Sequence, residues 1–391
     1  MKTDWQTKSL GQMCQLISGR HIDAKDYNTE SRGLGYLTGP SDFGAVHPIV
    51  TKWTEHPIVK AKNGDILITV KGSGVGKINL LDQDEVAISR QLMAVRVIGA
   101  DPRFVHSFLS STFEHFQSLS TGAAIPGISR EQVLGLQIPT PPLPEQRRIV
   151  AILDEAFDGI ATAKANAEKN LRNARALFDS HLRHVFTERA DKWQLRHESL
   201  AELCELIVDC EHKTAPTQTD GIASIRTPNI GKGKLLLDGV YRVSESTYFE
   251  WTRRAMPRPG DLVLAREAPA GNVAVIPENL KVCLGQRTVL IRPKLNFIQP
   301  RFLAFVLLHP AMQQTLLAHS RGATVQHVNL KDIRALHLGR IPSLAIQKEV
   351  IEWLDNASSG GERLESIYQQ KLAALDALKK SLLHQAFSGQ L

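Results

Sequence analysis

The sequence lacks the marks of several protein classes. Its 391 residues include only four cysteines, no two of them in a C-x-x-C pair. A disulfide framework and a structural zinc site are therefore not expected. We expect the protein to occupy a reducing compartment, the cytoplasm. The longest apolar run, 302–308, is far shorter than the roughly 20 residues that cross a bilayer. No secretory signal is recognisable, so a secreted or membrane protein is not expected.

Catalytic motifs are also missing. The chain contains neither an H-E-x-x-H metal motif nor a G-x-S-x-G nucleophile motif. Its glycine-rich stretch 71–77 departs from a phosphate-binding loop, because Lys71 stands where the first glycine belongs and Ile78 follows Lys77. We therefore predict a non-catalytic chain that binds no cofactor and no metal of its own.

The chain has only a small excess of positive charge. Lys and Arg number 47 against 40 Asp and Glu, a formal net charge of +7. Most of this excess lies in residues 188–341, where 21 basic residues stand against 15 acidic ones; residues 1–144 hold 14 against 13. A modest positive balance permits an acidic partner but does not require one.

The sequence does contain a second copy of itself. Segments of the first half recur in the second half, in the same order: 10–14 at 200–204, 63–67 at 259–263, and 153–154 at 354–355. The offset between matched segments rises along the chain, as expected if the second copy carries insertions. Collinear matches of this kind indicate an internal duplication with a period near 195 residues.

Each half reads as a mixed α+β segment followed by one long helix. Apolar runs at 65–70 and 261–265 predict buried strands. Amphipathic helices are predicted at 102–118 and 300–319, and each begins with a proline. The predicted division has two globular domains and two long helices: domains at 1–140 and 191–341, helices at 141–190 and 342–391.

The long helices carry seven-residue repeats. In the first these are Leu153, Ile160, Ala167 and Ala174; in the second, Leu354, Tyr368, Leu375 and Leu382, with an interruption at 358–361. Such repeats are typical of coiled-coil seams, although ordinary amphipathic helices packed on the domains are the alternative. One helix per repeat predicts an antiparallel pair, and hence a pseudo-twofold α+β protein.

A pseudo-twofold protein suits a ligand with two related half-sites, of which duplex DNA is the commonest. Three paired loops carry suitable polar residues: 36–41 opposite 224–229, 71–77 opposite 266–272, and 89–91 opposite 285–287. Arginine and asparagine side chains can make bidentate hydrogen bonds to base edges, whereas lysine more often contacts phosphates. The predicted DNA-binding residues are Thr38, Ser41, Lys71, Ser73, Lys77, Arg90, Gln91, Arg226, Thr227, Asn229, Lys232, Lys234, Arg266, Gln286 and Arg287. For each of them, a turn or a solvated surface charge is the alternative.

The order of these segments resembles that of the specificity subunits of type I restriction–modification systems. The resemblance covers the whole chain and rests on Pro-Pro-Leu-Pro-Glu-Gln-Arg-Arg-Ile-Val at 141–150, its degenerate copy at 342–350, and the C-terminal 382–391. The second copy has Ala-Ile-Gln at 345–347 where Pro-Glu-Gln is usual, so identical contacts at its helix start are not assumed.

The resemblance implies two target-recognition domains, each reading half of a bipartite double-stranded DNA target. The helices, about 60 Å long if they have about 40 residues, would set the separation of the domains and bind partner subunits. Two methyltransferase subunits would bind S-adenosylmethionine and methylate adenine, and a motor–endonuclease subunit would use ATP and Mg. A coiled-coil scaffold without DNA readout and a self-contained nucleic-acid enzyme are the alternatives.

Overall fold

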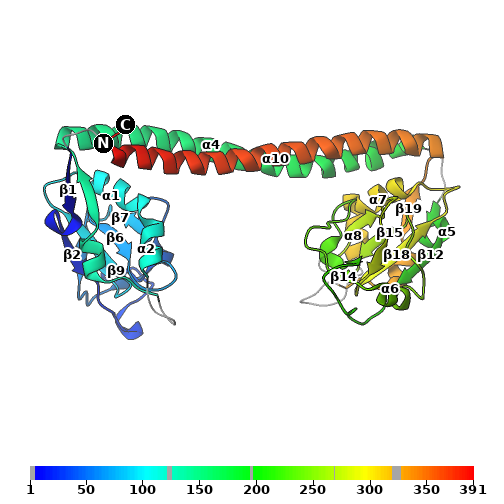
Figure 1. The fold of residues 1–391 in the computed structure, drawn as a ribbon, viewed down its shortest axis with the longest axis horizontal. Helices are drawn as coiled ribbons and strands as arrows, with labels where there is room; N and C mark the ends of the chain where they lie inside the picture. Colours follow the sequence, from blue (N-terminus) through cyan, green and yellow to red (C-terminus); the bar gives the residue numbers. More distant parts are fainter. Residues whose placement is uncertain (1–4, 121–125, 194–196, 268, 319–326) are drawn as a thin grey trace. The chain divides into compact units, whose positions relative to one another are not determined.

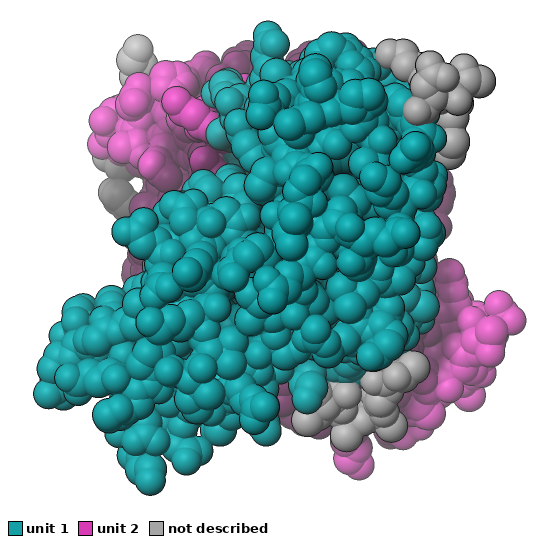
Figure 2. All heavy atoms as spheres, turned by 90° about the vertical axis from the view of Figure 1, so that its left-hand side faces the viewer, with its two compact units in different colours: residues 1–168, 370–391 teal, residues 169–369 magenta. Residues whose placement is uncertain are grey.

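The protein divides into two compact units. The structure, a computed structural model, describes residues 5–120, 126–193, 197–267, 269–318 and 327–391. Unit 1 comprises residues 1–168 and 370–391, and unit 2 comprises residues 169–369 (Figures 1 and 2). Helices α4 (Leu143–Arg183) and α10 (Leu344–Ser388) each begin in one unit and end in the other. Each unit therefore holds one globular domain, the start of one long helix and the end of the other.

Unit 1 contains two four-stranded sheets. The first, in the order β2-β9-β6-β7, is antiparallel and consists of β2 (Cys14–Ser18), β6 (Ile66–Thr69), β7 (Ile78–Leu80) and β9 (Leu92–Val97). The second, in the order β4-β3-β8-β5, has β3 and β8 parallel and consists of β3 (Leu34–Leu37), β4 (Trp53–Thr54), β5 (Lys60–Lys62) and β8 (Glu85–Ile88). The remaining elements are β1 (Gln6–Ser9), which pairs with β10 (Gln137–Thr140), and α1 (Pro102–Ser111), α2 (Phe113–Leu119) and α3 (Arg130–Leu134).

Unit 2 repeats this strand order. Its first sheet, β12-β18-β15-β16, consists of β12 (Cys204–Asp209), β15 (Leu262–Ala265), β16 (Val273–Val275) and β18 (Thr288–Pro293). Its second, β14-β13-β17, again has a parallel pair and consists of β13 (Ile222–Ile225), β14 (Arg242–Val243) and β17 (Val282–Leu284). The remaining elements are β11 (His197–Ser199), which pairs with β19 (His337–Arg340), and α5 (Leu200–Leu203), α6 (Glu245–Trp251), α7 (Pro300–Leu308), α8 (Pro310–Ala318) and α9 (Leu330–Arg334). The shared order confirms the predicted duplication.

The first sheet of each unit is a middle layer. In unit 1, Ile66 and Ile68 of β6 pack in the cluster that contains Phe104 of α1, whereas Leu67 packs with Leu37 of the second sheet. β15 divides its side chains between two clusters in the same way. A strand that is covered on both faces is apolar at every position, which is why both segments read as continuous apolar runs.

Each amphipathic helix predicted after the first sheet is in fact two helices. Thr112 separates α1 from α2, and its N–H and its hydroxyl both donate to the Leu109 carbonyl, at 3.1 and 2.8 Å. Pro310 separates α7 from α8, because proline cannot donate the backbone hydrogen bond that would continue a helix. His319, the predicted end of the second helix, lies outside the described residues.

The long helices pair antiparallel inside each unit. In unit 1, Lys164 of α4 contacts Asp376 of α10 at 2.7 Å, and Arg148 near the start of α4 donates to the carbonyl of Leu391. In unit 2 the Arg175–Glu365 ion pair and the His181–Trp353 ring contact give the same antiparallel direction. The predicted antiparallel coiled coil is confirmed within each unit.

The seven-residue repeats form the helix seam. All four repeat residues of α4 are buried, as is Leu354 of α10, while the other three repeat residues of α10 are partly buried. The predicted interruption at 358–361 does not break α10. Gly361 takes the repeat position that follows Leu354, and a Cβ there would lie 3.7 Å from the Ala174 carbonyl oxygen. The helices therefore approach closely at this point.

A buried glutamine fixes the start of each long helix. Gln146 accepts from the Asp101 N–H at 2.9 Å and donates to the Pro141 carbonyl at 2.8 Å, which ties α4 to the start of α1. Gln347 makes the equivalent two contacts in unit 2 and a third to the carbonyl of Phe297. The helix start that departs from the Pro-Glu-Gln pattern thus keeps the contacts of its glutamine.

The end of each long helix is anchored by phenylalanine. Phe387 of α10 packs edge-on against Phe104 of α1 at a centroid distance of 5.3 Å. Phe186, in the π-helical turn His184–Arg189 that follows α4, packs against Phe302 of α7 at 5.6 Å. Each globular domain is thereby held by the start of one long helix and the end of the other.

Candidate nucleic-acid interface

The three predicted loops of unit 1 meet at the end of the parallel strands β3 and β8. The Ser89 hydroxyl donates to the Thr38 carbonyl, which joins the third loop to the first. The Val70 N–H donates to the Gln91 carbonyl at 2.8 Å, which joins the second loop to the third. Gly74 of the second loop abuts the proline of the first, so that an added Cβ would lie 2.7 Å from the ring. The three loops form one surface.

The loops of unit 2 meet in the same way. The Gly285 N–H donates to the Ile225 carbonyl at 2.8 Å, and the Arg266 N–H donates to the Arg287 carbonyl at 2.9 Å. The first of these bonds repeats the Ser89–Leu37 backbone bond of unit 1. The duplication therefore extends to the hydrogen bonds that hold the loops together.

The pairing predicted for the second loops was wrong by one residue. The backbone bonds place Arg266 opposite Val70, and Glu267 opposite Lys71. The error arises because the loop is one residue shorter in unit 2. Gly76 donates to the carbonyl of residue 69, seven residues back, and Gly271 to that of residue 265, six back. An ungapped comparison aligned the glycines and shifted the strand end.

The predicted residues of unit 1 divide into exposed and bracing side chains. Those exposed on the loop surface are Ser41, Lys71, Ser73, Lys77, Arg90 and Gln91. Thr38 instead braces its loop, because its N–H and its hydroxyl donate to the buried Asp42 carboxylate at 2.6 and 2.8 Å. Asp42 lies in the 3-10 turn Pro40–Asp42 and was missed at the sequence level; a carboxylate in a turn is the usual sign of such a brace.

The predicted residues of the first loop of unit 2 are arranged similarly. The Arg226 guanidinium is exposed and lies 5.4 Å from the centroid of the Tyr241 ring. Asn229 accepts from the Arg226 N–H and donates to the Leu236 carbonyl, so its amide braces the turn Thr227–Asn229. Thr227 is half-buried in that turn.

Two predicted lysines lie away from the other candidate residues. Lys232 contacts Asp179 of α4 at 3.0 Å, and Lys234 contacts Glu362 of α10 at 2.7 Å. The bridge between 230 and 235 makes this segment a hairpin. The hairpin attaches the second domain to the helix pair.

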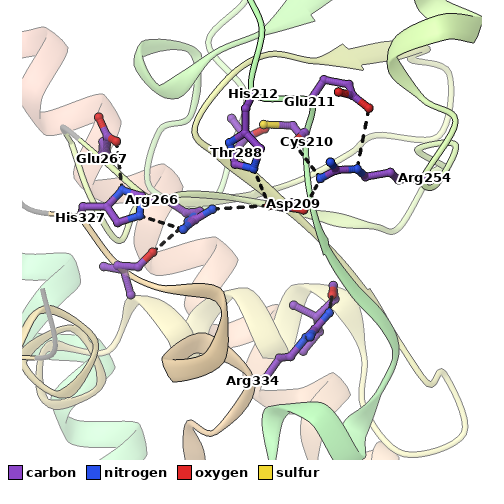
Figure 3. Close-up of polar contacts among 12 residues, drawn as sticks. Asp209, Cys210, Glu211, His212, Arg254, Arg266, Glu267, Thr288, His327 and Arg334 are labelled. Carbon is purple, nitrogen blue, oxygen red and sulfur yellow. Dashed lines mark hydrogen bonds and ion pairs between the residues drawn. The ribbon is translucent and has the colours of Figure 1, made fainter.

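Arg266 is buried beneath the loops, with only 7% of its surface exposed. Its Nε donates to the Val328 carbonyl at 2.9 Å, one Nη donates to His327 Nε2 at 2.8 Å, and the other lies 3.8 Å from Asp209 (Figure 3). Because arginine can only donate, His327 Nε2 accepts and its Nδ1 carries the proton. The guanidinium is thus held on every side.

Glu267 connects this buried arginine to the surface. It accepts from His327 Nδ1 at 3.0 Å through one oxygen and contacts Arg287 at 2.8 Å through the other. A hollow of about 160 Å³ lies here, lined by His212, Arg266, Glu267, Gln286, Arg287 and His327. The Gln286 amide donates to the His212 carbonyl at 2.8 Å and forms its edge.

Asp209, His327 and Glu267 were missed at the sequence level. They come from the end of β12, from the segment before α9 and from the loop after β15. Asp209 also contacts Arg254 at 2.6 Å and His212 at 2.9 Å (Figure 3). No local spacing joins these residues, since the sheet brings them together across more than a hundred positions.

The described part of the chain contains no cluster of three or more His, Cys, Asp or Glu side chains arranged to hold a metal ion. Among the same residues, none of the helices is long and apolar enough to cross a membrane. All four cysteines are buried as free thiols, and burial raises the pKa of Cys14, Cys204 and Cys283 to about 12. Those three thiols are therefore protonated at neutral pH.

Known proteins share this architecture. The chain is 22% identical over 406 residues to the type I restriction enzyme MjaVIII specificity subunit of Methanocaldococcus jannaschii, covering 99% of this chain and 93% of that protein. It is 23% identical over 312 residues to the EcoBI specificity subunit of Escherichia coli, covering 74% and 65%. A further M. jannaschii relative matches over 41% of its own length. A chain in a structure concerned with complex assembly and conformational transition of the type I R-M system shares the fold, with a TM-score of 0.80, 20% identity, and coverage of 100% of this chain and 99% of that one.

The family match covers both halves. Residues 2–171 and 248–372, about three quarters of the chain, match the model of the type I restriction modification DNA specificity domain. These ranges include the three loops of unit 1 and the second and third loops of unit 2, together with most of both long helices. The chain belongs to the type I restriction modification DNA specificity domain family.

Proposed function

We propose that this chain is the sequence-recognition subunit of a type I restriction–modification complex, and that each globular domain reads one half of a bipartite DNA target. The observation that carries the proposal is the repeated loop surface. Two domains of the same strand order each bring three loops together and expose on them residues that bond bases and phosphates, among them Arg90 and Gln91 in one and Arg226 and Arg287 in the other.

The two readers would engage DNA with different amounts of charge. The first domain is nearly neutral, so its affinity would depend on where Lys71, Lys77 and Arg90 lie on the loops. Contacts to phosphates fix position and contacts to base edges fix sequence. We assign Lys71 and Lys77 to the phosphates, because lysine acts as a point charge. The exposed side chains of Arg90, Gln91, Arg226 and Arg287 are assigned to the bases.

The helix pair would set the spacer and bind the partners. α4 and α10 have 41 and 45 residues and both pass from one unit into the other. Partner subunits would supply the chemistry: two methyltransferase copies with S-adenosylmethionine, and a motor–endonuclease with ATP and Mg. The chain itself would be non-catalytic and would act with these partners on DNA in the cytoplasm.

The proposal is tested by co-expressing the chain with its methyltransferase subunit and mapping methylated adenines across the genome. We expect one motif of two short halves around an unread spacer, and binding by the purified complex that weakens steeply with salt. Methylation or cleavage by the purified chain alone would instead support a self-contained enzyme. Absence of any specific footprint from the assembled complex would support a protein-binding scaffold.

The role of the helices has a test of its own. Inserting one matched heptad into α4 and into α10 lengthens the pair by about 10 Å, which corresponds to about three base pairs. We expect the unread spacer to grow by that amount while both halves of the motif keep their bases. An unchanged spacer would show that the helices do not set the distance.

A further inference from the structure

The third loops of the two units occupy equivalent places but differ in sequence. The turn after β8 carries Arg90 and Gln91, and the turn after β17 carries Gln286 and Arg287. The Val70–Gln91 and Arg266–Arg287 backbone bonds place Arg287 opposite Gln91. A guanidinium in one domain thus occupies the position that a carboxamide occupies in the other.

The backbone at Arg287 is strained. Its φ is +67°, and Ser31 is the only other non-glycine residue with positive φ in the described ranges. A left-handed conformation brings Cβ close to the following carbonyl, so it disfavours any residue but glycine. Yet the Arg287 side chain is 60% exposed and contributes little to the core. The turn therefore holds an arginine at a position where glycine would fold more easily.

The direction of the Arg287 guanidinium is set from below. Glu267, whose side chain is only 15% exposed, contacts it at 2.8 Å and is itself held by His327. Arg266 then fixes His327. This chain of charged and polar groups has no equivalent among the described residues of unit 1, where Val70 and Gly127 stand opposite Arg266 and His327. The carboxylate restricts the rotation of the exposed arginine and leaves its outer N–H groups free to bond a ligand.

We propose that Arg287 bonds a guanine in the second half of the target, and that Gln91 bonds an adenine at the corresponding place in the first half. The inference rests on the proposed function and names the bases that these positions select. Two N–H groups of a guanidinium match O6 and N7 of guanine in the major groove, whereas a glutamine amide matches N6 and N7 of adenine.

The experiment maps methylated motifs in cells that carry the wild-type complex and single variants. Arg287→Gln is expected to change a guanine to adenine at one position of the second half, with the first half unchanged. Arg287→Lys is expected to keep guanine with weaker selection, since lysine also reaches O6 and N7 but without the planar fork. Gln91→Arg is expected to change an adenine to guanine in the first half only. Arg363→Gln, which removes an exposed arginine on α10, is the control and should leave the motif intact.

Binding to duplexes distinguishes base contact from structural support. The wild-type complex should prefer the target over a duplex substituted at that guanine by about 10- to 100-fold. Arg287→Ala should remove this preference and leave discrimination at every other position unchanged. Equal weakening on all duplexes would mean a phosphate or structural role and would overturn the assignment. The assignment would also be overturned if no guanine preference in the second half changed when residue 287 was substituted.

A glycine variant keeps the assignment testable if other variants assemble poorly. Arg287→Gly relieves the positive φ, so its melting temperature should equal or exceed that of the wild type while guanine selection disappears. A clearly lower melting temperature with guanine selection intact would contradict the proposal. A wild-type complex that yields no bipartite motif would refute the proposed function itself, whereas a bipartite motif insensitive to position 287 refutes only this inference.

Discussion

Units 1 and 2 share the contacts that join their strands and helices, but they differ in the residues beneath their loops. A bidentate ion pair joins β6 to β9 in unit 1 and β15 to β18 in unit 2, formed by Asp65 with Arg96 and by Asp261 with Arg292. The glutamines that fix the long helices and the phenylalanines that anchor them are also repeated. Beneath the loops, by contrast, Arg266 of unit 2 takes the place of the apolar Val70.

The ladder of the first sheet locates a further difference. Ser18 pairs with Met93 in unit 1, and Asp209 pairs with Val289 at the matching place in unit 2. A hydroxyl there gives way to a carboxylate that contacts Arg266. The duplicated chain has therefore kept the residues that join strands and helices, and has changed those that orient the side chains on the surface.

The two domains also differ where they meet the long helices. In unit 2 the 230–235 hairpin carries two lysines that pair with acidic residues of α4 and α10. In unit 1 the hairpin bridged at 43 and 48 has Ala45 and His47 instead, and an open groove of about 590 Å³ separates it from the helices. The first domain contacts the long helices through other ion pairs, Arg103 with Asp154 of α4 and Glu114 with Lys380 of α10.

The largest expected effect comes from the repeated ion pair. Asp261→Ala leaves the Arg292 guanidinium, 12% exposed, without its carboxylate and should destabilise unit 2 by about 3–5 kcal/mol. Asp65→Ala should cost less in unit 1, because Arg96 is 32% exposed and can turn to water. Hydrogen exchange of peptides from each unit measures both losses. Equal losses would mean that burial does not decide the strength of the pair.

A smaller effect is expected when unit 2 receives the residue of unit 1. Arg266→Val removes the partner of the Val328 carbonyl and of His327, and should destabilise unit 2 by about 2–3 kcal/mol. Denaturant unfolding of the purified chain measures this loss, with the exposed Arg363→Gln as a control expected to change stability by less than about 0.5 kcal/mol. A neutral Arg266→Val would show that the buried network does not support the loops.

The smallest expected effect is a loss of stability at low pH. Burial lowers the pKa of His106 in α1 to about 4, aided by the positive charge of Lys379 and Arg103, whereas Ala304 stands at this position in α7. Since the unfolded histidine binds its proton near pH 6.5, stability is complete above that pH and falls as the pH drops toward 4. At pH 5 the loss should be roughly 1–2 kcal/mol.

His106→Gln should remove this loss from unit 1 and leave the acid response of unit 2 as it was. Hydrogen exchange of peptides from both units at pH 7 and pH 5, corrected for the intrinsic rate, measures the difference. An unchanged pH response in unit 1 would show that His106 is protonated in the folded protein.

Much of the fold could be predicted because its determinants are local and occur twice. Apolar runs marked the central strands, and seven-residue repeats marked the long helices that the structure shows between Leu143 and Arg183 and between Leu344 and Ser388. Helix breaks were harder to see. At the end of α1 the N–H and the hydroxyl of Thr112 both bond the Leu109 carbonyl, which no periodicity records.

The candidate site was predicted less completely, because position within the fold decides what a polar residue does. The exposed Lys71, Arg90 and Gln91 lie on one surface as expected, but Arg266 is buried, and Lys232 lies against a long helix. In the sequence, an exposed arginine or lysine looks the same as a buried or helix-bound one. Only the strand pairing separates a side chain that faces solvent from one that supports its neighbour.

Independent reading by the two units is the central claim, and a domain exchange tests it most directly. Residues 1–140 are replaced by the corresponding domain of a relative with a different target, the chain is expressed with its methyltransferase subunit, and methylated adenines are mapped. We expect one half of the motif to change, while the other half and the spacer stay as they were. A change in both halves, or in neither, would contradict the account.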